Sequence, residues 1–291
     1  TPADLAANFP DATGKIAVFV HGLCETDEAW RGFPPRADDP RVPFGRRMQL
    51  ELGYTPLFVR FNSGLHISDN GRNLALLLED VFAGWPVPAE EVTLIGHSMG
   101  GLIARSACHV AEGTDLRWGP AVKHVFCLGT PHTGADLERG VHLLDWALGQ
   151  ATESRAFSRA LRMRSAGIKD LRFGSCSEAD WHGQDPDAFF VDRCEEVPFL
   201  PHAAYYFIGA TLSPEPLGRV FGDLLVRAPS AAGIGRTKRL PFEVDNGRAL
   251  AGLNHFDLLS HPDVYEQIRL WIERPPKPSP ELSVGEGPAP Q

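Results

Sequence analysis

The sequence lacks the features that define several large classes of protein. Its 291 residues contain 5 cysteines, none of them in a CxxC pair, so neither a structural zinc site nor a disulfide-rich scaffold is indicated. Lysine and arginine are not clustered, and the net charge of −9 argues against a nucleic-acid partner, which usually requires a basic surface. No apolar run reaches the roughly 18 residues of a membrane-spanning helix. We therefore expect a soluble globular protein without a transmembrane segment.

The N-terminus also lacks a recognisable targeting signal. Residues 1–14, TPADLAANFPDATG, contain no positively charged region followed by an apolar stretch. This absence favours a cytoplasmic location. Because the chain begins with Thr1 rather than methionine, removal of a signal peptide, and hence a secreted location, is the alternative.

What the sequence does contain is an alternation of apolar strands and amphipathic helices. Its hydrophobic content of 43% is that of a globular protein. Short β-branched runs predict strands over 15–22, 55–61, 92–97, 124–132 and 204–211, and helical periodicity predicts helices over 71–85, 101–113 and 262–273. This order is typical of an α/β fold, with a mostly parallel sheet and helices on both faces.

Two stretches interrupt this alternation. Residues 31–45 are rich in proline and charge and predict a surface loop. Residues 137–200 are far longer than an ordinary strand-to-helix connection and contain amphipathic helical sequence, so we interpret them as a lid or cap over the carboxyl edge of the sheet. The core then consists of residues 1–136 and 201–274, and the Pro/Gly-rich tail, 275–291, is expected to be disordered.

The pentapeptide from Gly96 to Gly100 has the pattern G-x-S-x-G, between a predicted strand and a predicted helix. A sharp strand-to-helix turn of this kind exposes the hydroxyl of Ser98 at the N-terminus of a helix, where developing negative charge is favoured. Both flanking positions are glycine because larger side chains would collide with the neighbouring strand and helix. An ordinary tight turn is the alternative, but it does not account for this context.

A serine nucleophile needs a histidine base to remove its proton. His255 lies on a loop between the last strand-like stretch and the final predicted helix, where a parallel sheet presents side chains at its carboxyl edge. His261 is interpreted as a helix-entry or surface residue. His97 points the wrong way for a base, whereas His21 and His132 lie in loops at the same edge and are candidates to line the site.

The acid that orients the base should precede the histidine in the chain. Asp223 follows the fifth predicted strand and comes before an apolar pair. Asp245 and Asp257 are adjacent alternatives, and position alone places Asp223 only moderately ahead of them.

An oxyanion hole requires two backbone N–H donors. One is expected from Met99, the residue after the nucleophile, and the other from Leu23, in the loop that follows the first predicted strand. Gly22 lets the backbone of this loop approach closely.

Cys176 and Cys194 bracket a polar segment without an obvious hydrophobic core of its own. A disulfide between them would contribute roughly 3 kcal/mol in the loop-entropy model. Two free thiols are an equally weighted alternative.

Six segments together resemble bacterial lipases and esterases of the α/β-hydrolase fold, in particular the branch similar to GPI-inositol deacylases. The resemblance runs from about Lys15 to Glu273 and is weakest across the insertion. The segments are VFVHGL, YTPLFVRFNSGLHISDNGRNLA, LIGHSMGGLIAR, LGTPHTGADLE, GDLLV and LNHFDLLSHPDVYEQIRLWI.

The resemblance implies a catalytic triad and an oxyanion hole. The residues in these roles are Ser98 as nucleophile, Asp223 as acid, His255 as base, and Leu23 and Met99 as oxyanion donors. Related proteins often carry glycine directly after the acid, whereas this chain has Leu224, so the pattern departs from the family at the acid.

These observations predict a serine carboxylic-ester hydrolase that acts on medium-chain or lipid-like esters and requires no metal or organic cofactor. The insertion is expected to supply an apolar wall for the substrate from Leu143, Leu144, Trp146 and Leu148. An acyltransferase or thioesterase with the same triad is the alternative within enzymology. A catalytically silent relative that acts as a binding module is the alternative outside it.

Overall fold

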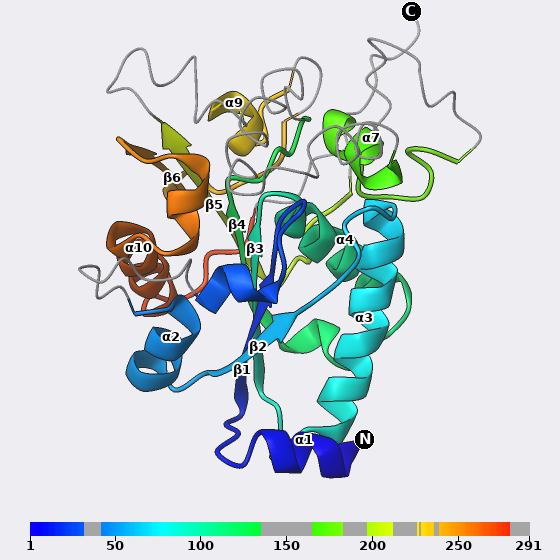
Figure 1. Cartoon of the computed structure of the whole chain (residues 1–291), viewed down its shortest axis with the longest axis vertical. Helices are drawn as coiled ribbons and strands as arrows, with labels where there is room; N and C mark the ends of the chain where they lie inside the picture. The colour runs from blue at the N-terminus through cyan, green and yellow to red at the C-terminus, as the bar shows by residue number, and fades with distance from the viewer. Residues whose placement is uncertain are drawn as a thin grey trace, which may run out of the picture.

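The computed structural model describes most of the predicted core of the chain (Figure 1). The described residues are 1–31, 42–134, 165–182, 197–211, 226, 228–235 and 239–279.

One sheet of six parallel strands runs through the molecule, in the order β2-β1-β3-β4-β5-β6. The strands are β1 (Lys15–Val20), β2 (Thr55–Val59), β3 (Glu91–His97), β4 (Val122–Leu128), β5 (Ala204–Thr211) and β6 (Gly247–Ala251). The first five coincide with the five predicted strands, and the predicted α/β fold with a parallel sheet is confirmed.

Helices cover both faces of this sheet (Figure 1). One face carries α3 (Ile67–Gly84) and α4 (Met99–Gly113), with α1 (Pro2–Asn8) packed against α3; the other carries α2 (Phe44–Leu52) and α10 (Pro262–Ile272). Two further helices, α7 (Ala166–Phe173) and α9 (Ala228–Ala231), lie at the end of the sheet toward which the strands run. Short 3-10 turns are η1 (Asp27–Arg31), η2 (Gly119–Ala121), η3 (Val244–Asn246) and η4 (His255–Leu259).

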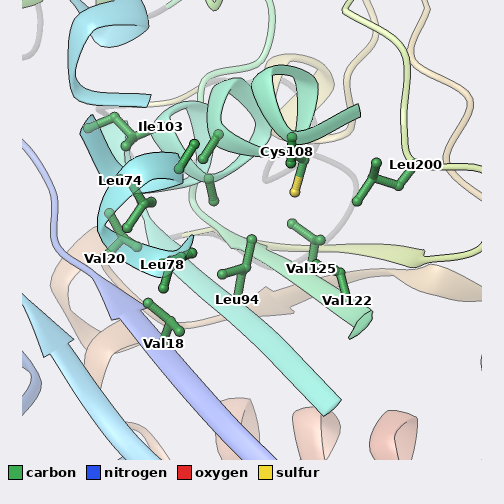
Figure 2. Packing of buried hydrophobic residues seen from close by; sticks show 14 of the residues in the cluster. Val18, Val20, Leu74, Leu78, Leu94, Ile103, Cys108, Val122, Val125 and Leu200 are labelled. Carbon is green, nitrogen blue, oxygen red and sulfur yellow. The ribbon is translucent and has the colours of Figure 1, made fainter. Parts of the chain in front are cut away.

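The strands are buried on both faces, so their side chains divide alternately between two hydrophobic clusters. In β1, Val18 and Val20 point to the cluster under α3 and α4, whereas Phe19 belongs to the cluster under α2 and α10. Figure 2 shows the first cluster, in which Leu74 and Leu78 of α3 lie over the strands. This two-sided packing fixes the strand ends, and hence the loops that follow them.

Strand β6 and helices α1 and α2 are among the elements that were not predicted. Strand β6, with the sequence GRALA, is an edge strand with largely exposed side chains and has little apolar signal. Helix α2 begins at Phe44, inside the stretch 31–45 that was interpreted as a loop, while residues 32–41 lie outside the described part. Helix α1 has seven residues and no buried side chain, so its amphipathic pattern is weak.

Helices α3 and α4 approach closely where Gly71 faces Ser106. A Cβ atom at Gly71 would lie 2.2 Å from Ser106 Oγ and 2.4 Å from Ser106 Cβ. Glycine is therefore required here by space rather than by backbone conformation.

We predict that Gly71→Ala lowers the free energy of unfolding by about 1–3 kcal/mol, because overpacking outweighs the helix propensity gained. Urea denaturation measures the change. Gly113→Ala is the matched control, since Gly113 ends α4 at an exposed position where an added Cβ atom would meet nothing within 4 Å beyond its own turn of helix. Equal effects of the two substitutions would contradict the packing argument.

Candidate active site

Ser98 stands at a sharp turn between β3 and α4. Its φ of 51° and ψ of −120° lie in a region that residues other than glycine rarely adopt, at a cost of order 1–3 kcal/mol. The N–H of Ser98 donates to the carbonyl oxygen of Leu128 at 2.8 Å, which ties the turn to the end of β4. Strain of this kind persists only where the surroundings enforce it, and it is typical of functional sites.

The two glycines of the pentapeptide make this turn possible. A Cβ atom at Gly96 would lie 2.4 Å from the backbone nitrogen of Gly101 in α4. A Cβ atom at Gly100 would lie 2.2 Å from the carbonyl oxygen of Val20 in β1. The predicted collisions with the neighbouring helix and strand are confirmed.

The hydroxyl of Ser98 is not used to cap the helix. Ser98 occupies the N-cap position of α4, yet its side chain makes no capping hydrogen bond. The N–H groups in the first turn of a helix, which begins here with Met99, have no acceptor within the helix and carry a partial positive charge. This end of α4 is therefore suited to stabilise negative charge that develops beside Ser98.

The loop after β1 lies against Ser98. A Cβ atom at Gly22 would be 3.1 Å from Ser98 Cβ, so the backbone approaches the serine as predicted, and Leu23 follows directly. The loop then turns through Cys24, whose φ is 59° and whose N–H donates to Ser63 Oγ at 3.2 Å. Leu23 therefore belongs to the loop that contacts Ser98, and Met99 directly follows Ser98; their role as oxyanion donors stays a prediction.

His255 is the first residue of η4 and is buried. A Cβ atom at Gly129 would be 2.9 Å from His255 Cε1, so the imidazole packs on the backbone just beyond β4. The preceding residue, Leu128, accepts the N–H of Ser98. The structure therefore brings His255 and Ser98 to the carboxyl ends of β3 and β4.

Two buried groups beside this site were not assigned from the sequence. Glu25 Oε2 accepts the N–H of Gly22 at 2.6 Å, and the Glu25 carboxylate lies 3.0 Å from His97 Nδ1. Burial raises the pKa of Glu25, but His97 and the Gly22 N–H outweigh it, and the net pKa lies below the ordinary value. No motif marks Glu25, since only the folded chain brings it to His97.

Three other histidines considered in the sequence have structural contacts. His21 is buried and stacks on Phe61, with ring centroids 4.0 Å apart, and burial lowers its pKa. Arg105 Nη1 donates to His132 Nδ1 at 3.2 Å, and burial and this charge hold the pKa of His132 well below the ordinary value. His261 caps α10, which confirms its interpretation as a helix-entry residue.

Asp223 lies outside the described residues, so its role stays a prediction. The two alternatives for the acid have other partners. Asp245 is exposed and pairs with Lys277 at 2.7 Å. Asp257 accepts the N–H of Asn254 at 2.8 Å within the capping box of η4.

The residues predicted to form the apolar wall also lie outside the described part of the chain. They are Leu143, Leu144, Trp146 and Leu148. Within the same insertion, α7 packs on the segment after β2: the N–H of Gly167 donates to Gly64 O at 3.3 Å, and Asp170 accepts the N–H of Ile67 at 2.8 Å. A Cβ atom at Gly167 would lie 3.3 Å from Met99 Cε, so α7 reaches the residue next to Ser98.

Cys176, one of the two residues in the disulfide hypothesis, is a free thiol in this structure. Its side chain is buried in the cluster under α3 and α4, and its Sγ lies 3.6 Å from the carbonyl oxygen of Gly174. Burial raises the pKa of Cys176 to about 11. Cys194 lies outside the described residues.

Within the described ranges, no group of three or more histidine, cysteine or acidic residues is arranged to hold a metal ion. Among the same residues, no helix has the length and apolar character to cross a membrane.

Parts of the chain are similar in sequence to a known domain family and to curated proteins. Residues 75–173 match the model of the PGAP1-like alpha/beta domain. A triacylglycerol lipase of Burkholderia plantarii is 33% identical over 140 residues, which cover 47% of this chain and 35% of the lipase. A triacylglycerol lipase of Pseudarthrobacter phenanthrenivorans is 33% identical over 129 residues, covering 43% of this chain and again 35% of the lipase. The matched part thus spans about a third of these curated relatives.

Solved structures share the fold over most of the chain. The Bacillus licheniformis lipase BlEst2 in its mature form has a TM-score of 0.54 at 18% identity, covering 89% of this chain and 90% of the lipase. EstA from Clostridium botulinum has a TM-score of 0.55 at 13% identity, covering 88% and 86%. The chain has the α/β-hydrolase fold, and parts of it are similar to triacylglycerol lipases and to the PGAP1-like alpha/beta domain, in agreement with the resemblance drawn from its motifs.

Proposed function

We propose that the protein is a serine carboxylic-ester hydrolase. The observation that carries this proposal is Ser98 itself, held in a strained turn at the N-terminus of α4 with the Gly22 loop against it. A strained, uncapped serine at a helix N-terminus has little structural use, but it is what an activated nucleophile needs. The similarity to triacylglycerol lipases supports an ester as the substrate.

In the proposed reaction, His255 takes the proton of the Ser98 hydroxyl as the oxygen attacks the ester carbonyl. The tetrahedral oxyanion is held by the backbone N–H groups of Leu23 and Met99. Its collapse breaks the bond to the alcohol, which leaves with the proton from His255, and an acyl-serine remains. Water then attacks this acyl-serine with His255 again as base, and the carboxylic acid is released.

The acid in this scheme is Asp223, which would orient His255 and stabilise the imidazolium. Its assignment is supported by elimination, because Asp245 is a surface residue paired with Lys277 and Asp257 is used in a capping box. The chain order Ser98, Asp223, His255 is also that of α/β hydrolases.

We further propose that the substrate is a medium-chain or lipid-like ester. The predicted amphipathic helix in the insertion, together with the position of α7 against Met99, supports an acyl pocket covered by residues 137–200. The curated relatives, which are triacylglycerol lipases, support the same class of substrate.

Ser98→Ala should lower the kcat of ester hydrolysis by about 10⁴-fold or more. It should also abolish labelling by a fluorophosphonate probe. Peptide mass spectrometry should place the label of the wild-type protein on Ser98, and circular dichroism should show an unchanged fold. A label on any other serine would contradict the assignment.

His255→Ala and Asp223→Asn should each lower kcat by several orders of magnitude on the same ester, because base, orienter and nucleophile act as one unit. Asp245→Asn and Asp257→Asn are the matched controls and should stay within about tenfold of the wild type. If Asp223→Asn is silent while either control is strongly impaired, the acid has been misassigned.

Substituting Leu144 and Trp146 by alanine should flatten the dependence of kcat/KM on acyl-chain length. Each CH₂ buried in an apolar pocket contributes roughly 0.8 kcal/mol, or about fourfold in kcat/KM, until the pocket is full. A series of p-nitrophenyl esters from acetate to octanoate measures this. Equal losses on acetate and octanoate would show that the segment is structural support rather than an acyl pocket.

A further inference from the structure

A buried acidic side chain links the loop after β1 to the serine turn. Glu25 is 9% exposed and lies three residues beyond Gly22, whose N–H it accepts at 2.6 Å. Its two carboxylate oxygens lie 3.0 and 3.1 Å from Nδ1 of His97, which is fully buried and directly precedes Ser98. Glu25 thus contacts the two segments that meet at the nucleophile.

His97 continues this connection to the loop of the proposed base. Its Nε2 lies 3.1 Å from the backbone carbonyl oxygen of His255. The two rings are also adjacent, with centroids 4.6 Å apart, while Trp30 and Phe256 approach His97 from other sides. The His97 imidazole therefore connects Glu25, in the loop after β1, with His255 at the start of η4.

The partners of His97 determine how many protons it carries. A carboxylate faces Nδ1 and a carbonyl oxygen faces Nε2, and both of these groups accept hydrogen bonds. A neutral imidazole has one N–H and can satisfy one of them, whereas an imidazolium has two and satisfies both. The carboxylate also supplies the opposite charge that a buried imidazolium needs.

We propose that Glu25 and a doubly protonated His97 form a positioning pair, which fixes the oxyanion loop through the Gly22 N–H and the base through the backbone of His255. Neither side chain is assigned a proton-transfer step. Both act through the groups they hold, so they are positioning residues. The expected effect on kcat rests on the proposed function, whereas the existence of the hydrogen-bonded pair does not depend on it.

The pair also has an electrostatic role. During the proposed reaction His255 becomes an imidazolium beside the His97 ring, and two like charges at this distance would oppose the proton transfer. The carboxylate of Glu25 compensates the charge of His97, so that the pair as a whole is neutral. Glutamine at this position would keep the shape but remove the negative charge that keeps His97 doubly protonated.

The first arm of the test measures protonation without any substrate. In protein with ¹⁵N-labelled histidine at about pH 8, above the ordinary histidine pKa of about 6.5, NMR should show both ring nitrogens of His97 protonated. The signal is assigned by its absence in His97→Asn. In Glu25→Gln it should change to that of a neutral ring. A neutral His97 in the wild type at this pH would overturn the proposal.

The second arm measures the reaction. Glu25→Gln should lower kcat by about 10- to 100-fold and leave KM within about threefold, because loosened oxyanion donors and a displaced base act mainly in the transition state. Glu28→Gln is the matched control: it removes the same charge from an exposed side chain in η1, and kcat should not change. A Glu25→Gln enzyme with the kcat of the wild type would overturn the positioning role.

The measurements distinguish an error in the hydrolase proposal from an error in the proposed Glu25–His97 pair. A wild-type protein that neither hydrolyses esters nor labels at Ser98 contradicts the hydrolase proposal, whereas the His97 signal still decides whether the pair exists. If Glu25→Gln does not fold, the wild-type NMR measurement remains decisive, and His97→Gln supplies the kinetic comparison. Wild-type kcat in a folded His97→Gln enzyme would equally overturn the positioning role.

Discussion

The strained backbone of Ser98 is the constraint on which the rest of the site depends. The turn forces a non-glycine residue to a φ of 51°, and it fits only because Gly96 and Gly100 leave room for α4 and β1. The hydrogen bond from Ser98 to Leu128 fastens the turn to the neighbouring strand. Hydrophobic packing on both faces of the sheet therefore stabilises a backbone conformation that is unfavourable for Ser98 on its own.

The same packing gathers groups from distant parts of the chain. Because all six strands run in one direction, the loops after β1, β3 and β4 open at one edge of the sheet, and η4 returns to that edge beyond β6. Gly22, Ser98 and His255 meet there, and Glu25 and His97 connect them. The arrangement accounts for a buried acid and a buried histidine in a region where charge is costly.

Much of this could be predicted from the sequence, for identifiable reasons. Strands buried on both faces have continuous apolar runs, so β1 to β5 were found, while β6 is an exposed edge strand and was not. The serine turn has a motif because its sterics dictate glycine at fixed positions, and His255 follows from the order of elements. Glu25 has no such signature, since its importance depends on a contact with His97, 72 residues away.

The proposed mechanism requires that Ser98 becomes acylated during turnover. It is tested most directly by mixing the protein with a p-nitrophenyl ester, quenching in acid within the first turnovers, and analysing its peptides by mass spectrometry. We expect a burst of about one p-nitrophenol per chain and a matching acyl group on the peptide that contains Ser98. Ester hydrolysis without a burst and without an acylated Ser98, or with the acyl group on another residue, would contradict it.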